Sequence, residues 1–183
     1  MANELSGKKI AFLVAMEGIE QVELTSPWEA VEAAGGEPVL VAPERGKVQA
    51  YNHLDKGDTF EATVATNDLD AEDYAGVVLP GGVANPDQLR TDEPAVSFLR
   101  KWARAGRPIA AICHGPWTLV EADVVRDKTL TSWPSLQTDV RNAGGDWRDE
   151  QVWRCDKDFS LVTSRKPDDL DAFNAAIVEL FAS

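Results

Sequence analysis

Hydrophobic runs of strand length alternate with segments of helical periodicity in the amino-terminal part of the chain. Residues 8–15 and 38–42 are continuous apolar runs. Between them, apolar side chains recur at close to helical spacing until Gly35-Gly36, at Val22, Leu24, Trp28, Val31 and Ala34. This pattern predicts a β-α-β unit. Because its strands are apolar throughout instead of alternating, it indicates a parallel sheet covered on both faces.

The same order of elements recurs in the middle of the chain. Gly76–Leu79 has the pattern of a strand, Pro94–Ala105 that of a helix, and Pro108–Ile112 that of the next strand. The apolar face of this helix carries Ala95, Phe98, Leu99 and Trp102. The alternation of strands and helices predicts an α/β fold with a doubly wound, mostly parallel sheet.

A β-hairpin and a final helix are expected near the carboxyl end. Trp153–Cys155 and Ser160–Thr163 flank a polar turn and predict the two strands of the hairpin. The helix follows Pro167, and its inward face is expected to hold Leu170, Phe173, Ile177 and Leu180. A chain of 183 residues can bury one sizeable core, so we expect a single domain over residues 1–183.

The chain is strongly acidic, with 31 Asp and Glu residues against 18 Lys and Arg residues and a formal charge of −13. Such a charge repels phosphate backbones and anionic lipids, so we expect neither nucleic acid nor a membrane as a partner. The amino terminus lacks the basic and then apolar layout of a signal peptide, and no apolar run approaches the length of a membrane span. The cytoplasm is therefore the expected location.

Cysteines and histidines are few. Cys113 and Cys155 lie far apart with no CxxC pair, and His53 and His114 are the only histidines. We therefore expect reduced thiols, no metal site, and a structural role for Cys155 on the predicted hairpin. No glycine-rich nucleotide-binding motif follows a strand, so no cofactor is expected.

Cys113 is the candidate nucleophile. The apolar run 109–112 ends abruptly at Cys-His-Gly-Pro, and residues 117–122 have a helical pattern. A cysteine at such an elbow lies at a helix amino terminus, where the dipole and free N–H groups favour the thiolate. A buried cysteine can also be only a small hydrophobic residue, but the His-Gly-Pro that follows favours a reactive role. His114 can act as a general base, or only make a hydrogen bond within the turn.

Two further groups of residues can converge on this elbow. Glu20 and Glu23 are three residues apart at a predicted helix start, so both can lie on one face near the ligand end of the sheet. Either carboxylate can be catalytic, and both can simply offset the helix dipole. Gly81 and Gly82 follow a predicted strand, where paired glycines can aim backbone N–H groups at an oxyanion or merely turn the chain.

With these residues together, the sequence resembles the ThiJ/PfpI family, in particular its PfpI branch, over nearly its whole length. The matching segments are residues 18–24, 48–60, 79–82, 111–116 and 131–141. The resemblance implies a flavodoxin-like sandwich, a nucleophilic Cys113, an acidic partner from the first helix, and self-association into a dimer or a larger oligomer.

The resemblance also implies roles for three other residues. Asp87 stands where an acid from a neighbouring subunit orients the histidine in PfpI-type proteins, although some members have the longer glutamate there and a loop one residue shorter. Trp133 stands where relatives can have a tyrosine near the pocket, and it can equally be an aromatic residue of the core. His53 falls in a segment that makes subunit contacts in this family and is expected to be structural.

Members of the family are described as intracellular cysteine peptidases, as glyoxalases or deglycases, and as oxidative-stress proteins. We expect a stress-response enzyme in which the Cys113 thiolate attacks a reactive carbonyl such as a 2-oxoaldehyde or its adduct. The backbone N–H groups of Gly82 and His114 would hold the oxyanion, and His114 with Glu20 or Glu23 would move protons. The alternatives are a redox sensor that oxidises Cys113 to sulfenic or sulfinic acid, and a peptidase, for which the sequence indicates no cleft.

Overall fold

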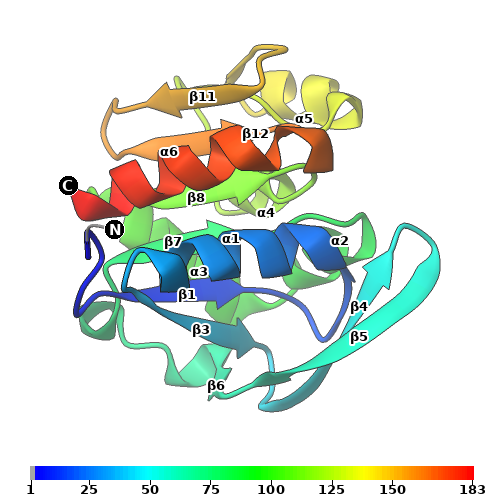
Figure 1. Cartoon of the computed structure of the whole chain (residues 1–183). Coiled ribbons are helices and arrows are strands. Elements are labelled where there is room, and N and C mark those ends of the chain that lie inside the picture. The colour runs from blue at the N-terminus through cyan, green and yellow to red at the C-terminus, as the bar shows by residue number, and fades with distance from the viewer. Residues whose placement is uncertain (1–2) are drawn as a thin grey trace.

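A seven-stranded sheet forms the centre of the molecule in the computed structural model, which describes residues 3–183 (Figure 1). The first two residues of the amino-terminal segment considered above lie outside this range. The strand order is β11-β12-β8-β7-β1-β3-β6. The strands are β1 (Lys9–Leu13), β3 (Glu37–Ala42), β6 (Val64–Ala65), β7 (Gly76–Leu79), β8 (Ile109–Ile112), β11 (Val152–Cys155) and β12 (Leu161–Ser164).

Pairing within this sheet is parallel except at one edge. β1 pairs in parallel with β3 and β7, β8 pairs in parallel with β7 and β12, and β11 is antiparallel to β12. All residues of β7 and β8 are buried, as expected of apolar strands covered on both faces. The predicted α/β fold with a mostly parallel sheet and a terminal hairpin is confirmed.

Helices cover both faces of the sheet. Figure 1 shows α1 and α6 together on one face and α2, α3 and α4 on the other. The helices are α1 (Gln21–Ala33), α2 (Ala84–Leu89), α3 (Glu93–Arg104), α4 (Pro116–Glu121), α5 (Gln137–Asn142) and α6 (Leu170–Ala182), with 3-10 turns η1 (Thr66–Asp68), η2 (Ala71–Asp73), η3 (Pro134–Leu136) and η4 (Pro167–Asp169). Two layers of apolar side chains, one on each face, form the core.

The predicted inward faces of α3 and α6 are buried as expected. Val22, in contrast, is 38 % exposed although it was grouped with the apolar face of the first helix. It lies on the side of α1 opposite Leu24 and Val31, because these residues are two and nine positions further along a helix of 3.6 residues per turn. The periodicity of this segment is therefore weaker than the sequence suggested.

Two small sheets lie outside the central one. They are the parallel pair β9 (Thr129–Leu130) and β10 (Asp146–Trp147), and the three-stranded sheet β2 (Glu17–Glu20), β4 (Gly46–Asn52) and β5 (Asp55–Ala62). Figure 1 shows the β4–β5 hairpin extending away from the body of the protein, and we call this hairpin the β4–β5 arm.

The β4–β5 arm is fastened to the start of α1 by side chains. Gln21 Nε2 donates to Asp58 Oδ2 at 2.7 Å, and the Asp58 N–H donates to Gln21 Oε1 at 2.7 Å. At the tip, His53 has the left-handed φ of 58° and Leu54 is 95 % exposed. The arm thus brings an apolar tip next to the carboxyl ends of the central strands, where open α/β sheets bind ligands.

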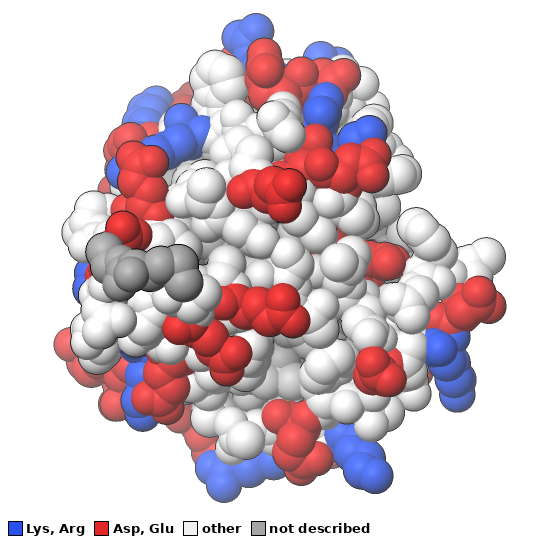
Figure 2. Space-filling view, viewed as in Figure 1, with Lys and Arg blue, Asp and Glu red and all other residues white. Residues whose placement is uncertain are grey.

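Acidic side chains are spread across the face of the molecule that Figure 2 shows, and Lys and Arg residues lie mainly toward its outline. This face offers no continuous basic surface to a polyanion. Within residues 3–183, no helix combines the length and the apolar character needed to cross a membrane.

Candidate active site

Cys113 is the first residue after β8 and has a left-handed backbone. Its φ is 61°, a conformation that is sterically unfavourable for a residue with a Cβ atom. Neighbouring strands and loops hold it there, because the Cys113 N–H donates to the Ser164 carbonyl at 3.0 Å and the Trp133 N–H donates to the Cys113 carbonyl at 2.8 Å. The side chain is only 6 % exposed and lines a pocket. The predicted elbow is present, with the sulfur at the end of a central strand.

Glu23 is the carboxylic acid beside the sulfur. It is completely buried in the first turn of α1, and its Oε2 accepts the Gly81 N–H at 2.9 Å. Oε1 has no hydrogen-bond partner among the described residues. A Cβ atom at Gly81 would lie 2.4 Å from Glu23 Oε2 and 2.7 Å from Cys113 Cβ. Only glycine at this position therefore lets the acid and the cysteine come together.

Burial sets the protonation of this pair. Desolvation raises the pKa of Glu23 to about 8, so the carboxyl is largely protonated at neutral pH. Burial, and next the negative charge that Glu23 can carry, raise the pKa of the Cys113 thiol above its ordinary value, whereas the Gly82 and His114 N–H groups lower it. The expectation that the elbow favours the thiolate is therefore corrected. The two amides lower the pKa of Cys113 as expected, but burial raises it by more. The helix that follows, α4, is short and begins with Pro116.

His114 lies between the sulfur and a loop. Its Nδ1 is 3.2 Å from Cys113 Sγ, and its Nε2 is 3.3 Å from Ser135 Oγ. Burial lowers the pKa of His114 to about 4, so the imidazole is neutral at pH 7. Its ring stacks on Trp133 with 5.8 Å between centroids and 23° between the planes. Trp133 is 38 % exposed and lines the pocket.

Glu20 is separated from Glu23 by a change of backbone conformation. It ends β2 and has extended angles, so the two acids do not share a helix face as the sequence suggested. Its Oε2 accepts the His53 N–H at 3.1 Å and lies 4.0 Å from His53 Nδ1. Glu20 and His53 therefore join the tip of the β4–β5 arm to the wall of the pocket.

The two glycines of the loop have different roles. The Gly81 N–H donates to Glu23, so of the two alternatives for the paired glycines it does not take the one of an oxyanion donor. Gly82 has a φ of 79°, and its N–H, like that of His114, faces the sulfur. Asp87 is exposed on α2 and does not line the pocket, and within this chain no contact of the described residues joins it to His114.

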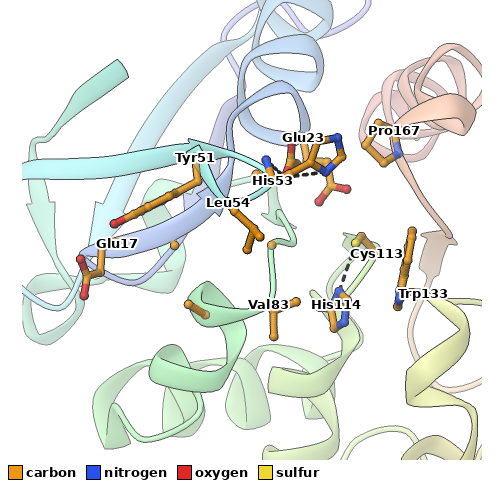
Figure 3. Close-up of a pocket in the computed structure, with 14 residues that line it drawn as sticks. Glu17, Glu23, Tyr51, His53, Leu54, Val83, Cys113, His114, Trp133 and Pro167 are labelled. Carbon is orange, nitrogen blue, oxygen red and sulfur yellow. Dashed lines mark hydrogen bonds and ion pairs between the residues drawn. The ribbon is translucent and has the colours of Figure 1, made fainter. Parts of the chain in front are cut away.

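These residues surround a pocket of about 480 Å³, a volume within the usual range for small-molecule sites. Figure 3 shows Cys113, His114 and Trp133 side by side, with Leu54 and Val83 on another side of the pocket. Its lining includes three glutamates and two histidines but no Lys or Arg. The lining residues are Glu17, Gly18, Glu20, Glu23, Tyr51, His53, Leu54, Gly82, Val83, Ala84, Cys113, His114, Trp133 and Pro167.

The sequence did not indicate several members of this site, among them Tyr51, Leu54 and Val83. Ser135, which contacts His114, is another. It is a loop serine in η3, two residues after Trp133, and no spacing or hydrophobic pattern distinguishes it. Cys155, the other thiol, is half-buried in β11 and does not line the pocket. Among residues 3–183, no group of three or more His, Cys, Asp or Glu side chains is arranged to hold a metal ion.

Comparison with known proteins gives a consistent result. The DJ-1/PfpI family model matches residues 8–180. The chain is 39 % identical over 180 residues to protein/nucleic acid deglycase 2 of Escherichia coli, covering 96 % of this chain and 99 % of that protein. It is 38 % identical over 173 residues to putative cysteine protease YraA of Bacillus subtilis, covering 94 % and 98 %. The crystal structure of Drosophila melanogaster DJ-1beta matches with a TM-score of 0.83 at 25 % identity, over 100 % of this chain and 92 % of that one.

Proposed function

Because this chain belongs to the DJ-1/PfpI family, we propose that it is a cysteine-dependent enzyme acting on reactive carbonyl compounds, namely 2-oxoaldehydes or their adducts. The observation that carries the proposal is the 3.2 Å contact between Cys113 Sγ and His114 Nδ1, beside a buried acid in a small pocket. The names of two relatives, a deglycase and a putative cysteine protease, also support an enzyme with a cysteine nucleophile.

The first step is addition of the sulfur to the carbonyl carbon. The neutral His114 takes the thiol proton at Nδ1 as the S–C bond forms, and the C=O π electrons move to oxygen. The N–H groups of Gly82 and His114, which face the sulfur, are close enough to stabilise the adjacent oxyanion. Return of the proton from His114 to this oxygen gives a neutral thiohemiacetal.

The remaining steps need only proton transfer and water. For a 2-oxoaldehyde, transfer of the C1 proton to C2, together with transfer of the C1 hydroxyl proton to the C2 oxygen, converts the adduct into a thioester with a hydroxyl group at C2. Glu23 is the buried acid beside the sulfur, and in its ionised form it is placed to carry the C1 proton. Hydrolysis of the thioester by water releases a 2-hydroxy acid and regenerates the Cys113 thiol.

We assign this activity to a single-domain stress-response protein of the cytoplasm. The strongly acidic chain favours small carbonyls or modified proteins over nucleic acid as substrates. Self-association into a homo-oligomer is part of the same proposal, with Asp87 of a neighbouring copy approaching His114.

Turnover of methylglyoxal tests the function. The wild-type protein and the Cys155→Ser variant are expected to release lactate at similar rates, whereas Cys113→Ser falls to the uncatalysed rate. A panel of glycated amino acids run in parallel defines whether free oxoaldehydes or adducts are preferred. Equal turnover by wild type and Cys113→Ser would falsify the proposal.

A redox sensor is the second candidate, and the buried protonated Glu23 favours it specifically. Attack of the sulfur on hydrogen peroxide gives a sulfenic acid and water, and a second peroxide gives the sulfinate, whose oxygen Glu23 can stabilise with a hydrogen bond. Mass spectrometry after mild peroxide treatment distinguishes the two functions, since selective oxidation of Cys113 without carbonyl turnover indicates a sensor. A peptidase ranks third because the pocket is small for a polypeptide, and a casein-cleavage assay checks it.

A further inference from the structure

The loop of residues 131–136 encloses His114 on two sides. Its main chain is tied to the elbow by the Trp133 N–H, its indole ring stacks on the imidazole, and Ser135 Oγ lies 3.3 Å from Nε2. The loop is itself braced, because Trp147 Nε1 donates to Ser132 Oγ at 2.9 Å. Both ring nitrogens of His114 therefore have a partner within the same chain, one the sulfur and the other a serine hydroxyl.

We propose that Ser135 is a positioning residue that selects the tautomer of His114, accepting a hydrogen bond from Nε2–H so that the Nδ1 lone pair faces Cys113. The role in turnover rests on the proposed function, whereas the tautomer is a property of the protein at rest. Ser135 does not touch the reacting atoms and acts only through the imidazole.

The thiol and the serine together decide where the imidazole proton lies. A neutral imidazole carries one N–H, and both a serine hydroxyl and a thiol can donate or accept, so neither contact alone fixes the tautomer. When the Cys113 thiol donates to a bare Nδ1, the proton is on Nε2, and Ser135 Oγ is the acceptor that keeps this N–H hydrogen-bonded. Without that acceptor, the Nδ1–H form competes, in which the sulfur accepts and the thiol donates to Glu23.

The opposite tautomer is the unproductive one. With the proton on Nδ1, an N–H would face the S–H, and His114 could not accept the thiol proton as the sulfur attacks. Stacking on Trp133 fixes the plane of the ring but not its protonation. Ser135 is the described side chain that reaches the Nε2 edge of the ring.

Nitrogen NMR of the histidines tests this assignment directly. The chain has two histidines, so His53→Gln identifies the signals of His114. In protein labelled with ¹⁵N-histidine, the wild type is expected to show the Nε2–H tautomer as the dominant form at neutral pH. Ser135→Ala is expected to show a mixture of tautomers, and Ser135→Thr, which keeps the hydroxyl, is expected to restore the wild-type pattern. Ser97→Ala on α3 is the matched control and should leave the pattern unchanged.

Kinetics provide the second readout. If His114 is in the productive form for only part of the time, kcat for methylglyoxal falls about tenfold in Ser135→Ala with little change in KM, and Ser135→Thr recovers most of the loss. Circular dichroism and thermal melting establish that each variant is folded.

The proposal is overturned if folded Ser135→Ala keeps both the wild-type tautomer and the wild-type kcat, or if Asp87→Asn changes the tautomer and Ser135→Ala does not. The NMR result does not depend on turnover. A tautomer that shifts in Ser135→Ala while the wild type turns over no carbonyl substrate supports the positioning role and rejects the proposed function instead.

Discussion

Glu20 and Glu23 lie three residues apart, yet their carboxylates bind different segments around one pocket. Glu20 accepts the His53 N–H at the tip of the β4–β5 arm, and Glu23 accepts the Gly81 N–H beneath the sulfur. The separation arises because the backbone changes from strand β2 to helix α1 between them. One acid thus holds the tip of the arm, and the other adjoins the reacting atom.

Replacing Glu23 by glutamine removes its ionisation while nearly keeping its shape. Because the acid carries a proton during turnover in our mechanism, kcat for methylglyoxal should fall by roughly 100-fold. Glu29→Gln, an exposed position on the same helix, is the control and should retain wild-type kcat. Wild-type kcat in Glu23→Gln would show that the buried acid has no part in proton transfer.

The reactivity of the thiol should respond to the same substitution. The negative charge that Glu23 acquires with rising pH raises the pKa of Cys113, so Glu23→Gln should lower the pKa of this thiol. The rate of alkylation by iodoacetamide, followed against pH in a Cys155→Ser background, should then rise at lower pH than in the parent. A curve that stays in place or moves to higher pH contradicts the assigned pairing of carboxyl and sulfur.

Stability should depend on pH through Glu23 and His114 with opposite signs. The pKa of Glu23 is raised from 4.5 to about 8, so the native state holds a proton that the unfolded state releases, and stability is lost as pH rises across this interval. The pKa of His114 is lowered from 6.5 to about 4, so the unfolded state binds the extra proton, and stability is lost as pH falls across that interval.

From pH 4.5 to 6.5, Glu23 and His114 have opposite effects on the free energy of unfolding. From pH 6.5 to 8, only the effect of Glu23 remains. In that upper window the free energy of unfolding should fall with a slope of up to about 1.4 kcal/mol per pH unit relative to Glu23→Gln. Urea unfolding of both proteins at several pH values measures the difference. Parallel curves from pH 6.5 to 8 would mean that Glu23 is already ionised in the native state.

The charge of the pocket should select among carbonyl compounds. Glu17 and Glu20 line it and no Lys or Arg does, so an anionic aldehyde such as glyoxylate should have a kcat/KM roughly tenfold or more below that of neutral methylglyoxal. Glu17→Gln should reduce the difference in kcat/KM between methylglyoxal and glyoxylate by a few-fold. Added salt should reduce this difference in the wild type, because salt screens exposed charges. Electrostatic selection would be contradicted if the enzyme preferred glyoxylate, or if neither Glu17→Gln nor added salt altered the relative kcat/KM of the two compounds.

Much of the fold could be predicted because the central strands are buried on both faces and therefore apolar throughout. The β4–β5 arm could not be predicted in this way. β5 is exposed at most positions, and β4 buries only Val48 and Ala50, so neither strand has the continuous apolar pattern of the central sheet. Pairing with each other and with β2 adds to this small apolar contact in holding the two strands.

The candidate site likewise has one part that the local sequence predicts and another that it does not. The elbow could be predicted because the apolar run of the strand ends at Cys113-His114. The direction of the thiol pKa depends on how deeply the fold buries Cys113 and Glu23, which come from segments 90 residues apart, and local pattern carries no such information. The contact between Ser135 and His114 could not be predicted for a similar reason, because only the path of the loop brings the hydroxyl to the imidazole.

The attachment of the β4–β5 arm has a consequence for which molecules can enter. Gln21 and Glu20, neighbours at the junction of β2 and α1, make its side-chain hydrogen bonds with the body, whereas the chemistry depends on other residues. Selectivity by molecular size can thus change through these two side chains without altering the sulfur or its proton acceptor. Different residues therefore control which molecules enter the pocket and how those molecules react.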